Sequence, residues 1–205
     1  MKSVLISIQP YWVFLIIAKA MGWNTNKGKT IEVRKNHPKD ESWDKVAKIY
    51  CSKDKKSFAK IPKEYQPFME QFLGKVIGEF VCDRIDRISK RGIHSNFDYC
   101  YCSLNVFGND DIAIEITDIE NSCIPQEELN SYGFYSHCLY AWHISELVIY
   151  DKPKELSEFK KINRECWYAD LGLAKRDCPE CQNKGCFVQR PPQSWCYVER
   201  GGSDA

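Results

Sequence analysis

The segment spanning residues 29–34 restricts the fold more than any other part of the sequence. Side chains alternate between the two faces of a β-strand, so a strand here places Ile31 and Val33 together on one face. We expect that face to enter a core. The other face would form a polar site on a rigid element, and its members are Thr30, Glu32 and Arg34, with Lys29 at the mouth of the strand. An ordinary structural ion pair is the alternative interpretation.

The composition is that of a globular protein with no overall attraction to nucleic acid or membrane. The 205 residues are 43% hydrophobic and 28% charged, and the formal net charge is +1. Any nucleic-acid binding must therefore come from a local patch. The apolar start of the chain imitates a secretory signal, but Gln9 and Pro10 interrupt it, so we expect a cytoplasmic protein without a signal peptide. No apolar run reaches the ~20 residues needed to span a bilayer.

Apolar runs and turn residues predict an alternation of strands and helices. We expect strands at residues 4–8, 29–34, 45–51, 74–82, 111–117 and 139–150. A buried helix should cover residues 11–21, with further helices at 64–73 and from 125 onward. Residues 88–110 are expected to form a long loop or a hairpin.

Two further polar residues fall inside predicted strands. Glu79 is lodged among apolar neighbours and needs a partner if it is buried, for which Lys29 and Arg34 are the candidates. His143 shares a strand face with Ala141, and we expect it to line the same polar cavity as Arg34, although a satisfied structural histidine is the alternative. Residues 53–63 contain five lysines and no arginine, which indicates either a solvated loop or a patch that faces phosphates.

The order of these segments resembles the ASCH family. The likeness rests on residues 3–10, 29–34, 48–51, 74–80 and 142–144, in the expected order within residues 2–150. It implies an α+β, PUA-like fold: a small, mixed or antiparallel β-barrel with helices at its openings, and a cleft that binds RNA. Residues 152–156 and 190–198 resemble a subgroup encoded by phages and mobile elements of Gram-positive bacteria.

Some members of that family are amidohydrolases acting on acylated cytidine, and others are reported as ribonucleases. The resemblance implies Lys29 and Glu79 as the catalytic residues if this chain is an enzyme, acting as a general acid–base pair. The nucleophilic threonine of the amidohydrolases falls on Glu32, and a carboxylate cannot perform the same acyl chemistry. We therefore keep hydrolysis as an alternative.

The chain changes character after residue 150. We expect a barrel domain at 1–150 and a cysteine-rich extension at 151–205 that carries a zinc knuckle and a returning strand. A CxxC pair with further cysteines nearby suits tetrahedral Zn²⁺. The predicted ligands are Cys166, Cys178, Cys181 and Cys186, with Cys196 as an alternative. Free thiols in a packed loop are the competing interpretation.

Nucleic-acid binding is the function we expect. A base of RNA or a modified nucleotide would stack on an aromatic residue while Glu32 and Arg34 bind its polar edge. The stacking candidates are Trp12, Tyr50 and Trp142, each of which also suits a core. A third possibility is a phage protein that binds and inhibits a host system acting on nucleic acids.

Overall fold

The computed structural model describes residues 1–23, 25, 28–40, 42–91, 98–101, 117–134, 136, 138–162 and 187–200. The chain divides into two compact units, each of which contains one β-sheet. The first unit consists of Met1–Phe14, Asp40–Phe80 and Leu147–Ala205. The second consists of Leu15–Lys39 and Val81–Glu146.

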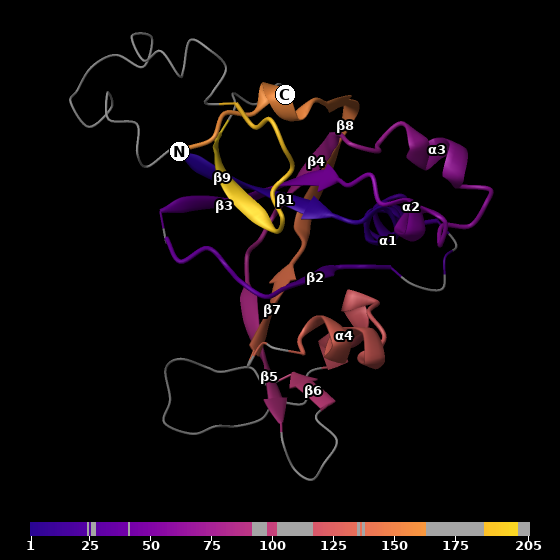
Figure 1. The fold of residues 1–205 in the computed structure, drawn as a ribbon, viewed down its shortest axis with the longest axis vertical. Helices are drawn as coiled ribbons and strands as arrows, with labels where there is room; N and C mark the ends of the chain where they lie inside the picture. The colour runs from indigo at the N-terminus through magenta and orange to yellow at the C-terminus, as the bar shows by residue number, and fades with distance from the viewer. Residues whose placement is uncertain are drawn as a thin grey trace. The chain divides into compact units, whose positions relative to one another are not determined.

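The five-stranded sheet of the first unit has β3 as its central strand, with β1 between β3 and β9 (Figure 1). Its strands, in the order β8-β4-β3-β1-β9, are β8 Ser145–Lys154, β4 Val76–Val81, β3 Trp43–Cys51, β1 Lys2–Ile8 and β9 Trp195–Glu199. β1 is parallel to β3 and antiparallel to β9. Val4, Leu5 and Ile6 are fully buried, as expected for a continuous apolar strand in the middle of a sheet.

The first unit also contains short helices. α2 Lys55–Phe58, α3 Gln66–Glu70 and the 3-10 turn η2 Leu156–Glu158 belong to it, whereas α1 Pro10–Ala20 begins in the first unit and enters the second after Phe14. α1 begins at a proline, whose missing N–H costs nothing at a helix start. Every residue from Val13 to Ala18 is buried, so the prediction of a buried rather than amphipathic helix is confirmed. α3 is shorter than the helix predicted for residues 64–73.

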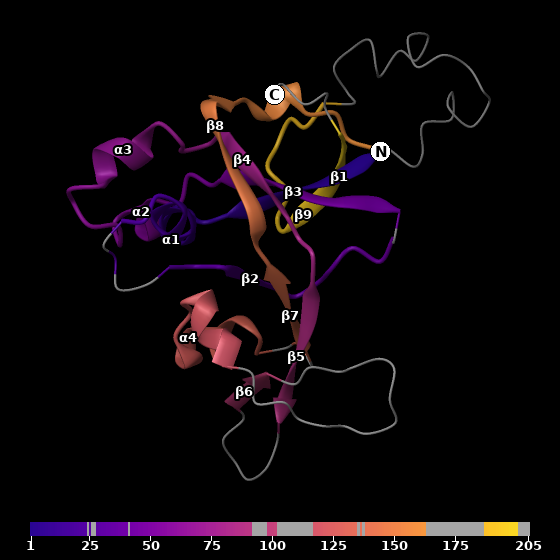
Figure 2. The ribbon, with the colours of Figure 1, turned by 180° about the vertical axis from the view of Figure 1, so that it is seen from behind.

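The second unit contains a four-stranded sheet in the order β2-β7-β5-β6 (Figure 2). Its strands are β2 Ile31–Arg34, β7 Cys138–His143, β5 Ile85–Arg91 and β6 Asp98–Tyr101, joined by antiparallel pairs. β5 and β6 form an antiparallel pair, as the hairpin alternative for residues 88–110 expects, and of that range the structure describes residues 88–91 and 98–101. The 3-10 turn η1 (Thr117–Ser122) and helix α4 (Gln126–Tyr132) belong to the same unit. Its apolar core is formed by Ile31, Val33, Ile88, Leu129, Leu139 and Ala141.

The α+β class is confirmed, but the described strands form two sheets rather than one closed barrel. The strand predicted for residues 139–150 is divided at Ile144 into β7 and β8, which join different sheets. Glu146 has a φ of +43°, in the left-handed region that interrupts a regular strand. The sequence pattern at residues 139–150 predicts an extended backbone. It does not reveal which strands the two halves of this segment pair with. The strand predicted for residues 111–117 lies almost entirely outside the described residues.

Candidate functional site

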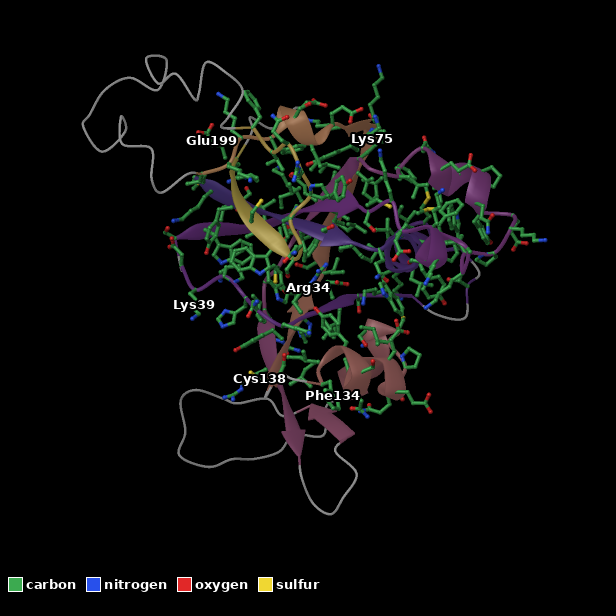
Figure 3. The ribbon with its side chains drawn as sticks, viewed as in Figure 1. Arg34, Lys39, Lys75, Phe134, Cys138 and Glu199 are labelled. Atoms are coloured by element: carbon green, nitrogen blue, oxygen red, sulfur yellow. The ribbon has the colours of Figure 1, made fainter. Side chains whose placement is uncertain are left out.

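Three charged side chains gather at β2 in the second unit. Arg34 Nη2 lies 2.9 Å from Glu32 Oε1, and Lys29 Nζ lies 3.3 Å from Glu32 Oε2. Lys29 Nζ also donates a hydrogen bond of 2.8 Å to the carbonyl oxygen of Ser122. The carboxylate of Glu32 is thus shared by the ammonium of Lys29 and the guanidinium of Arg34. Arg34 is labelled in Figure 3.

Backbone hydrogen bonds hold the start of β2 in place. The N–H of Thr30 donates to the carbonyl of Asn121 over 3.0 Å, and the carbonyl of Thr30 accepts from the N–H of Ile144 over 2.9 Å. Beyond this point Ile31 and Val33 are 1% and 4% exposed and pack in the core of the unit. The predicted alternation of an apolar and a polar face along this strand is confirmed.

The charged cluster is enclosed. Lys29, Glu32 and Arg34 are 1%, 6% and 7% exposed. Burial lowers the pKa of Lys29, while the neighbouring Glu32 carboxylate opposes that shift. The sequence predicted a cleft open to solvent, but within the described part of the chain these groups are shielded from it. Their first role is to fix β2, because removal of one member leaves a buried charge uncompensated.

His143 lies on the other face of this sheet from Glu32 and Arg34. In the β2–β7 pair His143 is opposite Ile31, whereas Trp142 is opposite Glu32. Directly opposed residues of an antiparallel pair share a face, so the prediction that His143 lines the cavity of Glu32 and Arg34 is wrong. The face of a strand residue depends on its register with the neighbouring strand, which alternation along one strand does not reveal.

The partners of His143 form a small polar cluster of their own. Its Nε2 lies 2.8 Å from Asp86 Oδ2 and 3.2 Å from Arg84 Nε. Arg84 Nε also forms an ion pair of 2.8 Å with the same carboxylate oxygen. A single imidazole nitrogen either donates or accepts, so the tautomer decides whether Nε2 bonds the carboxylate or the guanidinium. Both neighbours favour the structural role that was the alternative interpretation of the sequence.

Glu79, on β4 of the first unit, pairs with residues that the sequence did not suggest. Its Oε2 accepts hydrogen bonds of 2.6 Å from both Lys48 Nζ and Tyr150 Oη. Burial alone raises the pKa of Glu79, but the hydrogen bonds from Lys48 and Tyr150 and the nearby charges of Lys48 and Arg200 outweigh it, so the pKa lies below the ordinary value of a glutamate. The predicted partners, Lys29 and Arg34, instead share Glu32.

Lys29 and Glu79 each form an ion pair within their own unit. These contacts do not test the catalytic roles of the two residues, so their pairing as acid and base remains a prediction. A signal for the observed pair was present in the sequence. Lys48 lies between Ala47 and Ile49, so it is a charged residue among apolar strand residues, as Glu79 is. Unlike charges in such positions on separate strands can satisfy each other, but the strand order needed to pair them is a property of the sheet.

Two of the three stacking candidates are core residues. Trp142 is fully buried and Tyr50 is 4% exposed. Trp12 is half-buried on α1 and makes an edge-to-face contact with Tyr11, with ring centroids 5.0 Å apart. A largely buried ring cannot present its face to a base, so Trp142 and Tyr50 do not suit the stacking role. Tyr50 also borders a cavity in the first unit.

The five lysines of residues 53–63 form an exposed basic segment around α2. All five are exposed, namely Lys53, Lys55, Lys56, Lys60 and Lys63. The acidic residue within the segment, Asp54, caps α2 by accepting hydrogen bonds from the N–H groups of Lys56 and Ser57. The segment thus carries a local excess of positive charge on a chain whose formal net charge is +1.

The predicted zinc ligands Cys166, Cys178, Cys181 and Cys186 lie outside the described residues. The alternative ligand, Cys196, lies on β9 opposite Leu5, and burial raises the pKa of its thiol. The described residues contain no group of three or more His, Cys, Asp or Glu side chains arranged to hold a metal ion. In the same residues, no helix has the length and apolar character needed to cross a bilayer.

Neither a protein-family model nor a curated protein significantly matches this sequence. Among solved structures, ASCH from Zymomonas mobilis is similar at 13% identity and a TM-score of 0.42, over 97% of this chain and 88% of that one. A mutant of the same Zymomonas mobilis protein gives 12% identity and a TM-score of 0.42, over 98% of this chain and 92% of that one. At these values the likeness is distant, so the function is inferred from the residues themselves.

Proposed function

We propose that this protein binds nucleic acid, RNA in the first place, and that the basic segment Lys53–Lys63 holds the phosphates of the strand. The observation that carries the proposal is the set of five exposed lysines around α2. Asp54, the acidic residue among them, caps the helix with its carboxylate. Closely spaced ammonium groups release the counterions condensed on a phosphate backbone, which favours binding without sequence preference.

The buried cluster at β2 has a supporting role in this proposal. Glu32 and Arg34 are too enclosed to meet a base directly in the described part of the chain. We therefore no longer expect Glu32 and Arg34 to bind the polar edge of a base. The proposed contact is electrostatic, between the exposed lysines and the phosphates of the RNA. Contacts to phosphates position a strand but carry no sequence information.

The test is a binding titration with a labelled single-stranded RNA over a series of salt concentrations, repeated with DNA of the same sequence. Wild-type protein should bind more weakly as salt rises, with a slope of about −0.7 per neutralised phosphate. The triple variant Lys55→Gln, Lys56→Gln, Lys63→Gln should bind more weakly and show a shallower slope.

Lys45→Gln is the matched control, because Lys45 is also exposed but lies near the start of β3, outside the basic segment. It should bind as wild type does. Absence of binding by wild-type protein at low salt, or an unchanged slope in the triple variant, would contradict the proposal. Tighter binding of DNA than of RNA would reject RNA as the preferred strand.

A further inference from the structure

The first unit contains a cavity of about 490 Å³ at the end of β3. It lies where Tyr50, Ser52 and Lys53 meet Gly74, the turn η2 and residues 188–191. All of its lining residues belong to this one unit. Its volume falls within the range typical of sites for small ligands, which is roughly 300–1,000 Å³.

Two polar groups at the cavity lack a partner among the described residues. The hydroxyl oxygen of Ser52 is shielded from water and makes no hydrogen bond there. Lys53 is exposed, and its ammonium group has no ion-pair partner in the described part of the chain. Buried polar groups are normally hydrogen-bonded, so a hydroxyl without a partner and an ammonium without an ion pair, both lining one cavity, suit a ligand that accepts from both.

The position of Lys53 depends on a glycine. Gly74 has a φ of +77°, and a Cβ atom built on it would collide with Cε of Lys53 and lie 3.1 Å from its Nζ. The lysine side chain therefore runs directly over the Gly74 backbone, where a larger residue would displace it. The end of the Lys53 side chain therefore lies against Gly74, and both residues line the cavity.

The remaining charges at the cavity compensate each other. The carboxylate of Glu155 forms an ion pair with the ammonium of Lys75, which is labelled in Figure 3. Lys53 therefore leaves the cavity with an excess of positive charge. An excess of positive charge attracts an anionic group, and the compact ammonium of a lysine suits a phosphate.

The other walls suit a ligand with an apolar body and polar edges. Leu156 and Pro191 contribute apolar surface, whereas Tyr50 and Val188, which also line the cavity, are 4% and 0% exposed. Ser157 adds a hydroxyl group that can donate to or accept from a sugar or a base. A nucleoside monophosphate combines a phosphate, a ribose with hydroxyl groups and a flat base.

We propose that this cavity binds a nucleoside monophosphate, either free or as the phosphorylated end of a strand, with its phosphate at Lys53 and Ser52. The free-nucleotide form of the proposal stands independently of the proposed function. The strand-end form rests on the proposed function, because Lys53 is also the first lysine of the segment that would hold the following phosphates.

The experiment is isothermal titration of the full chain with AMP, GMP, CMP and UMP, and with the corresponding nucleosides. Wild-type protein should bind at least one monophosphate about tenfold more tightly than its nucleoside. Lys53→Gln should abolish that difference. Lys45→Gln should retain it, since Lys45 lies at the other end of β3, eight residues from Lys53 and roughly 25 Å away along the strand. Thermal unfolding should show that both variants fold.

A second arm uses single-stranded oligonucleotides that carry a 5′-phosphate, a 3′-phosphate or neither. A preference of about tenfold for one phosphorylated end assigns the cavity to strand ends. Monophosphate binding without such a preference assigns it to the free nucleotide. Either result supports the proposal.

Failure of the two proposals is distinguishable. Oligonucleotide binding that is insensitive to end phosphates, together with no binding of any monophosphate, would overturn the cavity proposal and leave the proposed function standing. Monophosphate binding without oligonucleotide binding would overturn the proposed function and leave the cavity proposal standing. Equal affinity of wild type and Lys53→Gln for monophosphates would also overturn the cavity proposal.

Discussion

Lys48 and Glu79 are bound to each other across neighbouring strands of the five-stranded sheet, with Nζ 2.6 Å from Oε2. Lys48 is 5% exposed, so its charge needs this carboxylate. Tyr150 Oη donates to the same oxygen from β8, which places the three polar groups on three consecutive strands. This contact holds β3, β4 and β8 in register at one point within an otherwise apolar core.

Replacing Glu79 by glutamine should lower the free energy of unfolding at neutral pH by about 1–2 kcal/mol, a modest value because a third of its side chain is exposed. The folded pKa of Glu79 is lowered from its ordinary value, so its carboxylate stabilises the fold fully above the ordinary pKa of a glutamate, and the contribution is lost as pH falls through the lowered pKa. Urea unfolding at neutral pH and at several acidic pH values should show the wild-type advantage shrinking toward acid. An advantage that does not change with pH would contradict this linkage.

Replacing Glu32 by glutamine should destabilise the protein more strongly, by about 3–5 kcal/mol, because Lys29 and Arg34 would remain buried beside each other without their carboxylate. Chemical denaturation at neutral pH measures the change. Glu127→Gln, on the exposed side of α4, is the matched control and should stay within about 0.5 kcal/mol of wild type. Equal stability of both variants would show that the β2 cluster is not buried as described.

Gly78→Ala should destabilise the sheet by about 1–3 kcal/mol. A Cβ atom at this position would collide with the backbone carbonyl of Val148 and lie 3.1 Å from Cα of Ile149, so β4 and β8 would have to separate. The melting temperature and a denaturant series measure the effect. Val148→Ala removes an exposed side chain from the same place and should change stability by no more than about 0.5 kcal/mol. A Gly78→Ala variant as stable as wild type would refute this close approach.

The cysteine spacing of the C-terminal extension predicts about one zinc ion per chain as purified, bound by Cys166, Cys178, Cys181 and Cys186. Metal analysis by mass spectrometry checks this directly. Substituting Cys178 and Cys181 together by serine should abolish the zinc content, whereas Cys51→Ser should retain it, since Cys51 is buried in the core with a pKa raised to about 12. Purified protein that contains no zinc, together with a fold that a chelator leaves intact, would contradict the prediction.

The sequence by itself determined which residues form most of the described strands and helices. Alternation at residues 31–34 predicted that Ile31 and Val33 share a face that enters the core and that Glu32 and Arg34 share the other face, because both facts depend only on the period of a single strand. It did not predict that Glu32 and Arg34 are buried as well. The apolar residues after Pro10 likewise predicted a buried helix. These are local properties of one element.

Only the tertiary structure decided which elements meet. The partner of Glu79, the face of His143 and the division of residues 139–150 between two sheets each depend on strand order and register. Register is set by the summed packing of many residues from distant parts of the chain, and a shift of one residue exchanges the two faces of a strand. The cavity beside Lys53 has the same origin, since four separate segments form its walls and no one of them shows it in the sequence.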